Sequence, residues 1–553
     1  MCISFWEKGG RSTSNKNNKE GGMSARRITR RKFIGTVAGG IVGLTTGLPL
    51  LAQELREGKF VGSKLHKVSE ERLRKAFEFE RKARSVCAAN CTQACGWNAY
   101  VKGEKYIIGL APAADYDTFD PVLGRYYNPR GCMRGASYLR YVYGEVRLKH
   151  PLIRVGKRGE GKFRRATWDE AIELISKKLT DIARKHGSDE IIFFSAIPAF
   201  SYVSAGSGYR LCKILGASGP LSFYDWYCDL PPGEPMTWSV QTEESEEADW
   251  LNAKLLIFWG ANVAESRLAA AHLLQEAKYR GTKVYAIFTD YNATARMADV
   301  FLSPKPGTDA AFVNGVINYL IETGSIDVDY VKTFTDLPFL IRKDNKKFLT
   351  EADLKKDGSP FKLFVYDNNS MKPVNPPGTL GDDRDTLDLK RYSIDPSLYY
   401  EGKVKLVDGK EVEVETVFLR LKREVSRFTP EKVFQITGIG EEALKQFAFD
   451  VATKKPAMII GGGGVNHWFN NDINNRSMIL LLALTGNIGK KGGGFSQYTG
   501  QYKVWLSGLG KYGMILKARP QNTTLFAWTH YDAELYSSGR PSRRSSRRSK
   551  RAG

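Results

Sequence analysis

The chain has 553 residues, of which 42% are hydrophobic and 26% charged, so it is long enough to bury a core without disulfide staples. Its formal net charge of +23 would favour nucleic acid or a membrane surface as a partner. However, residues 1–52 hold nine Lys/Arg and two acidic residues, and residues 540–553 hold seven Lys/Arg and no acidic residue, so we do not interpret the body of the chain as a nucleic-acid binder.

The first 52 residues have the pattern of an export signal. The basic stretch "RRITRRKFIG" at 26–35 precedes a glycine-rich apolar run that ends at Ala52, and its core resembles a twin-arginine motif. The alternative is a transmembrane anchor, because the apolar run is just long enough to span a bilayer. We expect export to the periplasm or to the outer face of the cytoplasmic membrane, with membrane association through partners or an uncleaved signal.

Three of the seven cysteines lie within nine residues. Cys87, Cys91 and Cys95 are spaced four apart, and Cys132 follows in "NPRGCMRG". A short cluster completed by one distant cysteine is typical of an iron–sulfur site. Zinc is the alternative, although the two CxxC pairs usual in zinc sites are absent. Cys212 lies in an apolar helical stretch and is predicted to belong to the core.

The middle of the chain alternates predicted strands and helices. Apolar strand-like runs occupy 189–196, the start of 253–267, and 281–290, with a helical pattern between the last two. This order predicts a parallel, doubly wound α/β sheet. Ligands on such sheets bind beyond the carboxyl ends of the strands.

Glycine-containing loops follow these predicted strands. Gly260 and Gly307 would allow close backbone approach to phosphates, and Asp309 could accept paired donors such as a guanine edge. A later strand is followed by four glycines at 461–464, without the strict spacing of a nicotinamide site. Residues 340–425 are polar and rich in Pro and Gly, which predicts a loop-rich insertion with a hairpin in "VKLVDGKEVEVET".

The cysteine segment and the sequence from "NPRGCMRG" to "TWDEAIELI" resemble the N-terminal region of molybdopterin oxidoreductases of the DMSO reductase family. The resemblance is greatest to the type II branch, which includes respiratory nitrate reductases and exported perchlorate, selenate and chlorate reductases. It implies a small iron–sulfur domain with antiparallel strands plus two doubly wound, Rossmann-like α/β domains, without the family's final β-barrel domain.

The domain boundaries that we expect follow from this resemblance. They are a signal region at 1–52, an iron–sulfur domain at 53–165, a discontinuous first pterin-binding domain at 166–215 and 430–538, a second at 216–429, and a basic tail at 539–553. Relatives continue well beyond this length, and the basic run "SRRSSRRSKR" would become mixed-charge and helix-favouring in another reading frame. We therefore expect a truncated or frameshifted C-terminus.

The resemblance also implies roles for particular residues near the metals. In this branch the first cluster ligand is often His, so Cys87 favours an ordinary four-thiolate 4Fe–4S cluster. Arg134 would lie between cluster and pterin. The segment "LSFYDWYCDLPPGEP" at 221–235 would supply the molybdenum ligand, with Asp225 the first choice and Asp229 the alternative. Without the resemblance, such an Asp would be interpreted as a turn cap, and Cys228 is interpreted as structural.

Further contacts are implied for the pterin cofactor and the substrate. Asn90 matches a position on the substrate side. The expected cofactor-binding residues are Arg134, Trp259, Gly260, Asn262, Asp290, Gly307, Asp309, Gly462, Gly463, Asn466 and His467. A lone histidine such as His467 is otherwise most often a structural hydrogen-bonding residue.

The function implied is two-electron oxygen-atom transfer at a molybdenum bis(molybdopterin guanine dinucleotide) centre, with nitrate or another small oxyanion as substrate and a reduced organic molecule as a further option. Electrons would pass through the cluster to an iron–sulfur partner subunit, accompanied by a haem b subunit and a dedicated assembly chaperone. Two alternatives stay open. One is an electron-transfer module that keeps the cluster without a competent molybdenum site, and the other is a zinc-stabilised α/β binding protein.

Overall fold

The computed structural model describes residues 78–87, 95–113, 131–194, 202–221, 232–238, 245–378 and 389–497. The export signal, Asn90, Cys91, both candidate molybdenum ligands and the basic tail lie outside these residues, so their roles stay predictions. The chain divides into two compact units, Met1–Glu78 and Phe79–Gly553, and the elements below belong to the second. No helix within the described stretches is both long and apolar enough to cross a membrane.

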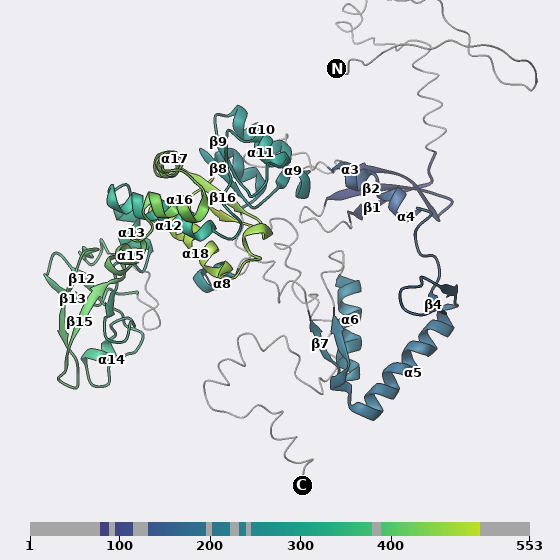
Figure 1. Cartoon of the computed structure of the whole chain (residues 1–553), viewed down its shortest axis with the longest axis horizontal. Coiled ribbons are helices and arrows are strands. Elements are labelled where there is room, and N and C mark those ends of the chain that lie inside the picture. Colours follow the sequence, from purple (N-terminus) through teal and green to yellow (C-terminus); the bar gives the residue numbers. More distant parts are fainter. Residues whose placement is uncertain are drawn as a thin grey trace, which may run out of the picture. The chain divides into compact units, whose positions relative to one another are not determined.

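The described chain begins with a three-stranded antiparallel sheet in the order β1-β2-β3 (Figure 1). Its strands are β1 (Arg81–Val86), β2 (Gly96–Lys102) and β3 (Tyr106–Pro112), followed by the short helices α3 (Met133–Ala136) and α4 (Tyr138–Val142). Trp97, Asn98, Ala99 and Val101 of β2 are buried, so this middle strand is covered over most of its length. Antiparallel strands were predicted here, and the cluster that they would hold is treated below.

A separate helical segment follows. The hairpin of β4 (Leu152–Arg154) and β5 (Phe163–Arg165) leads into helix α5 (Trp168–His186). The Thr167 side chain caps α5 by accepting a hydrogen bond from the Glu170 amide. Strand β6 (Ile192–Phe194), helix α6 (Tyr202–Leu215) and strand β7 (Ser218–Leu221) then form a parallel βαβ unit, and Cys212 on α6 is fully buried as predicted.

The largest sheet has five parallel strands in the order β10-β9-β8-β16-β17 (Figure 1). Its strands are β8 (Leu255–Trp259), β9 (Lys283–Ile287), β10 (Val300–Leu302), β16 (Ala457–Gly461) and β17 (Gly494–Ser496). The first two correspond to the predicted strands. Every residue of β8 and β16 is buried, as is typical of a parallel sheet covered on both faces.

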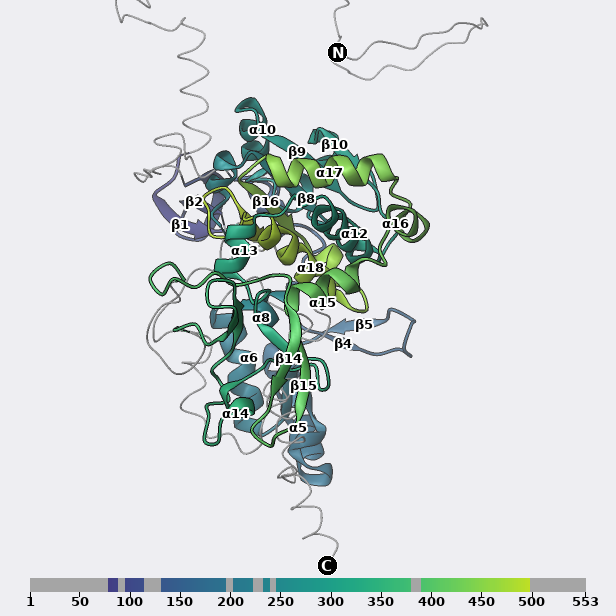
Figure 2. The same cartoon turned by 90° about the vertical axis from the view of Figure 1, so that its left-hand side faces the viewer.

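Helices cover both faces of this sheet (Figure 2). They are α8 (Gly233–Trp238), α9 (Val263–Ser266), α10 (Ala271–Tyr279), α11 (Ala293–Met297), α12 (Asp309–Glu322), α16 (Pro430–Thr437), α17 (Glu441–Thr453) and α18 (Asn471–Leu484), with a 3-10 helix at Glu247–Asn252. Successive residues of β8 point into different cores. Leu255 and Ile257 pack in the core formed with α12, α17 and α18, whereas Leu256 and Phe258 pack in the core formed with α10. The predicted doubly wound α/β arrangement is therefore present.

One predicted domain boundary is wrong. Residues 430–538 were assigned with 166–215 to a domain different from that of residues 216–429. The structure instead pairs β16 with β8 along its whole length, from Ala457↔Leu255 to Gly461↔Trp259. The reason is physical: an apolar run predicts a strand, but it does not reveal which distant strand will pair with it.

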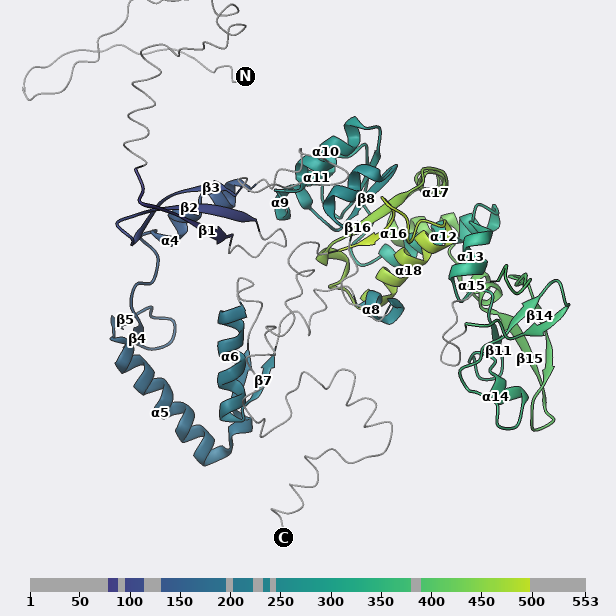
Figure 3. The same cartoon turned by 180° about the vertical axis from the view of Figure 1, so that it is seen from behind.

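An inserted unit with its own core lies between β10 and β16 in the sequence (Figure 3). It comprises β11 (Leu340–Arg342), α14 (Glu351–Leu354), β12 (Val365–Asp367), β13 (Lys372–Val374), β14 (Glu401–Lys405) and β15 (Glu411–Thr416). The flanking helices α13 (Val328–Phe334) and α15 (Val417–Val425) instead bury Val331, Phe418 and Val425 in the core of the five-stranded sheet. Strand β15 is the centre of an antiparallel sheet ordered β11-β15-β14, so the predicted hairpin is present.

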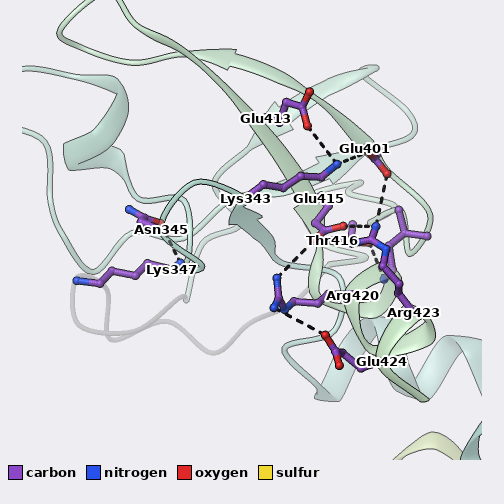
Figure 4. A network of polar contacts seen from close by, with 11 residues as sticks. Lys343, Asn345, Lys347, Glu401, Glu413, Glu415, Thr416, Arg420, Arg423 and Glu424 are labelled. Carbon is purple, nitrogen blue, oxygen red and sulfur yellow. Dashed lines mark hydrogen bonds and ion pairs between the residues drawn. The ribbon is translucent and has the colours of Figure 1, made fainter. Parts of the chain in front are cut away.

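A buried carboxylate ties this hairpin to α15 (Figure 4). The Glu415 side chain is almost wholly buried, and both of its oxygens accept hydrogen bonds from the Arg423 guanidinium, at 3.3 and 2.7 Å. Arg420 Nη1 lies 3.8 Å from Glu415 Oε1. Since an ionised carboxylate out of water requires paired donors, Arg423 supplies most of the compensation for burying Glu415.

We expect Arg423→Met to lower the free energy of unfolding by about 1–3 kcal/mol, because it removes two charge-assisted hydrogen bonds from a buried carboxylate. Urea unfolding of the purified chain measures this change. Lys403→Met is the matched control: Lys403 pairs with Glu411 at 3.5 Å while both side chains stay more than half exposed, so its loss should cost less than about 1 kcal/mol. Equal losses in the two variants would contradict the role assigned to Glu415.

Candidate functional site

Two of the predicted cluster cysteines meet at one end of the antiparallel sheet. Cys87 directly follows β1 and Cys95 directly precedes β2. The Cys87 amide donates a hydrogen bond to the Cys95 carbonyl oxygen at 2.9 Å, continuing the strand pairing of Val86 with Gly96. Cys87 and Cys95 therefore lie opposite each other where β1 ends and β2 begins.

Trp97 brings the third described cysteine toward this end of the sheet. Cys132 is the N-cap residue of α3, and the Trp97 ring lies against the glycines on either side of it. A Cβ atom would lie 2.1 Å from Trp97 Cζ2 if placed at Gly131, and 2.3 Å from the same atom if placed at Gly135. No larger residue therefore fits at either position. The glycines that flank Cys132 thus allow α3 to pack directly on the strand that begins beside Cys95.

Electrostatics also indicate that Cys87 lies near the helices after Cys132. The pKa of Tyr138 on α4 is raised, first by burial, then by Tyr141 and then by Cys87. Cys87, Cys95 and Cys132 are all of intermediate exposure. No three His, Cys, Asp or Glu side chains among the described residues form a group that could hold a metal, and Cys91 lies outside those residues.

The thiol donors present are of the type that an iron–sulfur cluster requires. The structure brings Cys87 and Cys95 together and packs the helix of Cys132 beside them, so the donor set fits a cluster in chemistry. Arg134 is exposed on α3, and its carbonyl oxygen accepts from the Ser137 hydroxyl at 3.1 Å. Its predicted place between cluster and pterin stays a prediction.

A second candidate site lies at the carboxyl edge of the five-stranded sheet. From β8 the chain runs outward to β9 and β10, and it later returns to place β16 and β17 on the other side of β8. The switch point of this topology is the gap beyond β8 and β16, where open α/β sheets bind their ligands. The loops at this point contain most of the predicted cofactor-binding residues.

Glycines let the two loops at the switch point approach each other by backbone alone. Gly260, at φ +61°, follows β8, and Gly462 follows β16. A Cβ atom at Gly462 would lie 2.1 Å from the Gly260 carbonyl oxygen, and one at Gly260 would lie 3.1 Å from Val465 Cγ1. The Gly462 amide donates to the Trp259 carbonyl oxygen at 3.0 Å. Gly463, partly buried, begins a short 3-10 helix that continues this loop.

The loop after β9 is joined to the loop after β8 by side-chain hydrogen bonds. The Thr294 hydroxyl donates to Asn262 Oδ1 at 2.8 Å and accepts from the Ala264 amide at 2.9 Å. Asn262 Nδ2 donates to Glu265 at 2.7 Å. Asp290, predicted from the same loop, is exposed. The structure therefore connects Asn262 to the loop after β9 through Thr294, while the predicted role of Asp290 stays a prediction.

Trp259 and Asp309 form a pair at the start of α12. Trp259 is fully buried, and its indole N–H donates to Asp309 Oδ1 at 2.7 Å. Burial raises the pKa of the Asp309 carboxyl, and the Trp259 hydrogen bond opposes that rise. One carboxylate oxygen is therefore already held in place, which orients the other.

The third predicted loop packs on the glycine-rich loop. A Cβ atom at Gly307, where φ is +75°, would lie 3.0 Å from Trp468 Cε3. The Trp468 indole N–H donates to the Gly464 carbonyl oxygen at 3.0 Å. Asn466 is fully buried, whereas His467 is exposed. The loops after β8, β10 and β16 thus meet, as the sequence predicted from their places after strands.

Sequence reasoning missed three buried amides at this edge. Asn474 and Asn475 on α18 form hydrogen bonds with the segments around them. Two polar residues in a helix that continues as an apolar run could have indicated a buried polar site. Gln497, just after β17, is fully buried, and neither of its amide atoms has a hydrogen-bond partner among the described residues. Its Oε1 lies 3.0 Å from the position of a Cβ at Gly461. A lone Gln after a strand has no sequence pattern that would reveal it.

The sheet and its glycine loops define a class of protein that binds a phosphate-bearing ligand at a topological switch point. Comparison with known families specifies the class: residues 147–537 match the molybdopterin oxidoreductase family. The chain belongs to this family.

Curated relatives agree with this assignment. The chain is 40% identical to the perchlorate reductase subunit alpha of Dechloromonas aromatica, over 84% of this chain and 52% of that protein. It is 38% identical to the respiratory nitrate reductase subunit alpha of Haloferax mediterranei, over 86% of this chain and 49% of that protein. It is 30% identical to the respiratory nitrate reductase 1 alpha chain of Escherichia coli, over 79% of this chain and 44% of that protein.

The chain spans about half the length of the curated relatives it matches. Among solved structures, acetylene hydratase from Pelobacter acetylenicus matches with a TM-score of 0.49 and 21% sequence identity, over 74% of this chain and 44% of that chain. That likeness is too weak to assign a role to any residue.

The described residues fit the molybdenum–molybdopterin cofactor that the family implies. Gly260 and Gly462 let the loops after β8 and β16 meet through backbone at the switch point, and the buried amide of Gln497 has no hydrogen-bond partner among the described residues. A buried amide without hydrogen bonds costs about 1–3 kcal/mol, so a polar ligand that satisfies it would explain why the residue is tolerated there.

We expect Gln497→Met to raise the unfolding free energy of the cofactor-free chain by about 1 kcal/mol, because it removes an unpaired buried amide. The same change should lower the amount of cofactor that co-purifies. Thermal unfolding and the GMP released by acid hydrolysis measure the two effects. Gln435→Met, at an exposed position on α16, should change neither quantity. A stabilised variant with unchanged cofactor content would show that the Gln497 amide has no ligand role.

Proposed function

We propose that the chain is the catalytic part of an exported molybdenum oxidoreductase that carries out two-electron oxygen-atom transfer, with nitrate or another oxyanion as substrate. The observation that carries the proposal is the meeting of the Gly260 and Gly462 loops at the switch point of the sheet, in a chain of the molybdopterin oxidoreductase family. The cofactor proposed is the bis(molybdopterin guanine dinucleotide) form.

The proposed roles of the residues follow from their positions. A molybdenum–pterin centre supplies the two-electron redox chemistry when bound. The loops containing Gly260, Gly307 and Gly462 would present backbone amides to the dinucleotide phosphates, and the oriented carboxylate of Asp309 would accept donors from its base. Trp259 holds Asp309 in position through its indole N–H.

Electron supply is proposed to pass through a 4Fe–4S cluster on Cys87, Cys91, Cys95 and Cys132. The relatives from Dechloromonas and Haloferax are named alpha subunits, which supports partner subunits for this chain as well. We propose an iron–sulfur electron-transfer subunit and a haem b subunit as those partners. The route of export stays a proposal that rests on the twin-arginine pattern at 26–35.

Metal analysis tests this function against both alternatives. The full chain, purified without oxygen from a host that makes molybdopterin, should contain about four irons and four sulfides per chain together with molybdenum and GMP. Iron and sulfide without molybdenum or GMP would support the electron-transfer module instead. Zinc without iron or sulfide would support a zinc-stabilised binding protein.

The candidate molybdenum ligand is tested by Asp225→Asn and Asp229→Asn. A neutral amide is a much weaker ligand than a carboxylate for a hard, high-valent metal, so the substitution at the true ligand should alter the molybdenum signal in electron paramagnetic resonance and abolish oxyanion reduction. The other substitution should leave the signal unchanged. An effect confined to Asp225→Asn would confirm the first choice, one confined to Asp229→Asn would establish the alternative, and unchanged signals in both would exclude a carboxylate ligand from this segment.

A further inference from the structure

Two consecutive asparagines on α18 are buried where the helix passes the candidate cofactor site. Asn474 is 3% exposed and Asn475 is 0% exposed, and both lie in the second turn of the helix. Asparagine is a poor helix former, and burying its amide is costly unless hydrogen bonds replace water. Two such residues in succession therefore need a specific explanation.

Asn475 links the glycine-rich loop to α8. Its Nδ2 donates to Asn466 Oδ1 at 3.0 Å, and its Oδ1 accepts from the Gly233 amide at 3.3 Å. Gly233 is the first residue of α8, and a Cβ placed there would lie 2.6 Å from Asn475 Cβ. The helices therefore touch at this point, and one side chain spans the distance between α8 and the loop.

Asn474 makes the corresponding link to α12. Its Oδ1 accepts from the Ala310 amide at 3.1 Å, and its Nδ2 donates to the Val465 carbonyl oxygen at 3.0 Å. Ala310 follows Asp309 in the first turn of α12. Each asparagine thus uses both ends of its amide, one toward residues 465–466 and the other toward the first turn of a different helix.

These contacts connect three parts of the candidate site, namely the loop that contains residues 465–466, the first turn of α12 and the start of α8. Residues 465–466 continue the loop that meets Gly260, and the first turn of α12 contains Asp309. The α8 helix follows the segment of the predicted molybdenum ligand in the sequence, with Asp225 and Asp229 eight and four residues before Gly233. A rearrangement of the loop would break the hydrogen bonds to both helices.

We propose that Asn474 and Asn475 form an asparagine clamp that positions the loop at 462–466 for cofactor binding, with Asn475 the positioning residue that couples this loop to α8. The proposal rests on the proposed function and extends it to two residues that touch no predicted reacting atom. It predicts that the clamp affects cofactor retention more than it affects the stability of the fold.

Asn475→Leu, made in the full chain, tests the clamp. It keeps side-chain size but removes the acceptor for the Gly233 amide and the donor to Asn466. Loss of a supporting contact around a metal or cofactor typically lowers affinity about 10–100-fold, so molybdenum and GMP per chain should fall at least tenfold. Asn475→Asp keeps an acceptor for the Gly233 amide, but it replaces the donor to Asn466 with a second carboxylate oxygen at a fully buried position, so it should also lose cofactor.

Asn487→Leu is the matched control. Asn487 is also fully buried, and its Oδ1 accepts from the Ala457 amide at 2.8 Å, but it lies at the opposite end of β16. This variant should lose comparable stability in urea unfolding and keep its molybdenum and GMP. Cofactor contents that fall equally in the Asn475 and Asn487 variants would overturn the proposal, as would folded Asn475 variants with wild-type contents.

Hydrogen exchange tests the clamp without any substitution, and it decides the question if the Asn475 variants do not fold. The Gly233 and Ala310 amides should exchange more slowly in the loaded chain than in the chain stripped of cofactor, whereas the Ala457 amide should not change. Equal exchange in both states would overturn the clamp. A wild-type chain that holds neither molybdenum nor GMP would instead contradict the proposed function itself, and the clamp with it.

Discussion

Cys132→Ser is expected to leave less than about one iron per chain, compared with about four in the wild-type protein. Cys132 is the only one of the four predicted ligands that lies outside the short cysteine segment, and it is held in place by the packing of Trp97 on its flanking glycines. Serine keeps the size and polarity of the side chain but replaces the thiolate that an iron–sulfur cluster requires. Iron and acid-labile sulfide, measured together with the visible absorption of the cluster, give the result.

Cys212→Ser is the matched control for this experiment. The Cys212 thiol is fully buried on α6, 3.6 Å from the Ala217 carbonyl oxygen, and burial raises its pKa, so it stays protonated at neutral pH. A protonated, enclosed thiol does not ligate iron, and this variant should keep its full iron content. Wild-type iron in Cys132→Ser, or equal loss in both variants, would contradict the assignment of Cys132 as a ligand.

Gly462→Ala is expected to lower the unfolding free energy by about 3 kcal/mol and to abolish cofactor retention, because the new methyl group would have to push two backbone loops apart. The φ of Gly462 is −125°, an ordinary value for any residue, so the effect comes from crowding alone. The added Cβ would lie 2.1 Å from the Gly260 carbonyl oxygen, and neither loop can yield without disturbing the strand before it. Urea unfolding and GMP content provide the two measurements.

Gly208→Ala is the control, and we expect it to change the free energy of unfolding in the opposite direction. Gly208 lies inside α6, and a Cβ there would meet no atom within 4 Å. Alanine should therefore stabilise the chain by about 0.5–1 kcal/mol through its better helix propensity, without changing cofactor content. If Gly462→Ala were as well tolerated as Gly208→Ala, the close approach of the two loops would be unimportant for the site.

Strands β8, β9 and β16 of the central sheet and the loops that follow them could be predicted from local sequence, whereas the short edge strands β10 and β17 were not predicted. An apolar run ending in glycine predicted β8 and the turn at Gly260, because periodicity and turn chemistry are local properties. Asp309 was predicted from the glycine-containing loop before it, and its contact with the cofactor stays a prediction.

The remaining features depend on contacts between residues far apart in sequence. Nothing within β16 indicates that it pairs with β8 rather than with the strands near 192–221, and the domain boundary was wrong for that reason. Asn475 has a role only because α8 lies across from it, and Gln497 is noticeable only because its amide is buried without a partner. Partner choice across such distances is a property of the whole packed chain.

The late position of β16 in the sequence, next to the central strand β8, has a consequence for the order in which the chain is assembled. Its partner β8 is synthesised long before it, and the entire inserted unit with its own core comes between them. Closing a pairing of such high sequence separation is slow, because the entropy of the intervening chain must be lost first. A growing chain therefore has no complete switch point until β16 and β17 have left the ribosome. We expect the early half to present an unpaired β8 edge during that interval, and a chaperone that covers this edge would be most useful before the cofactor arrives.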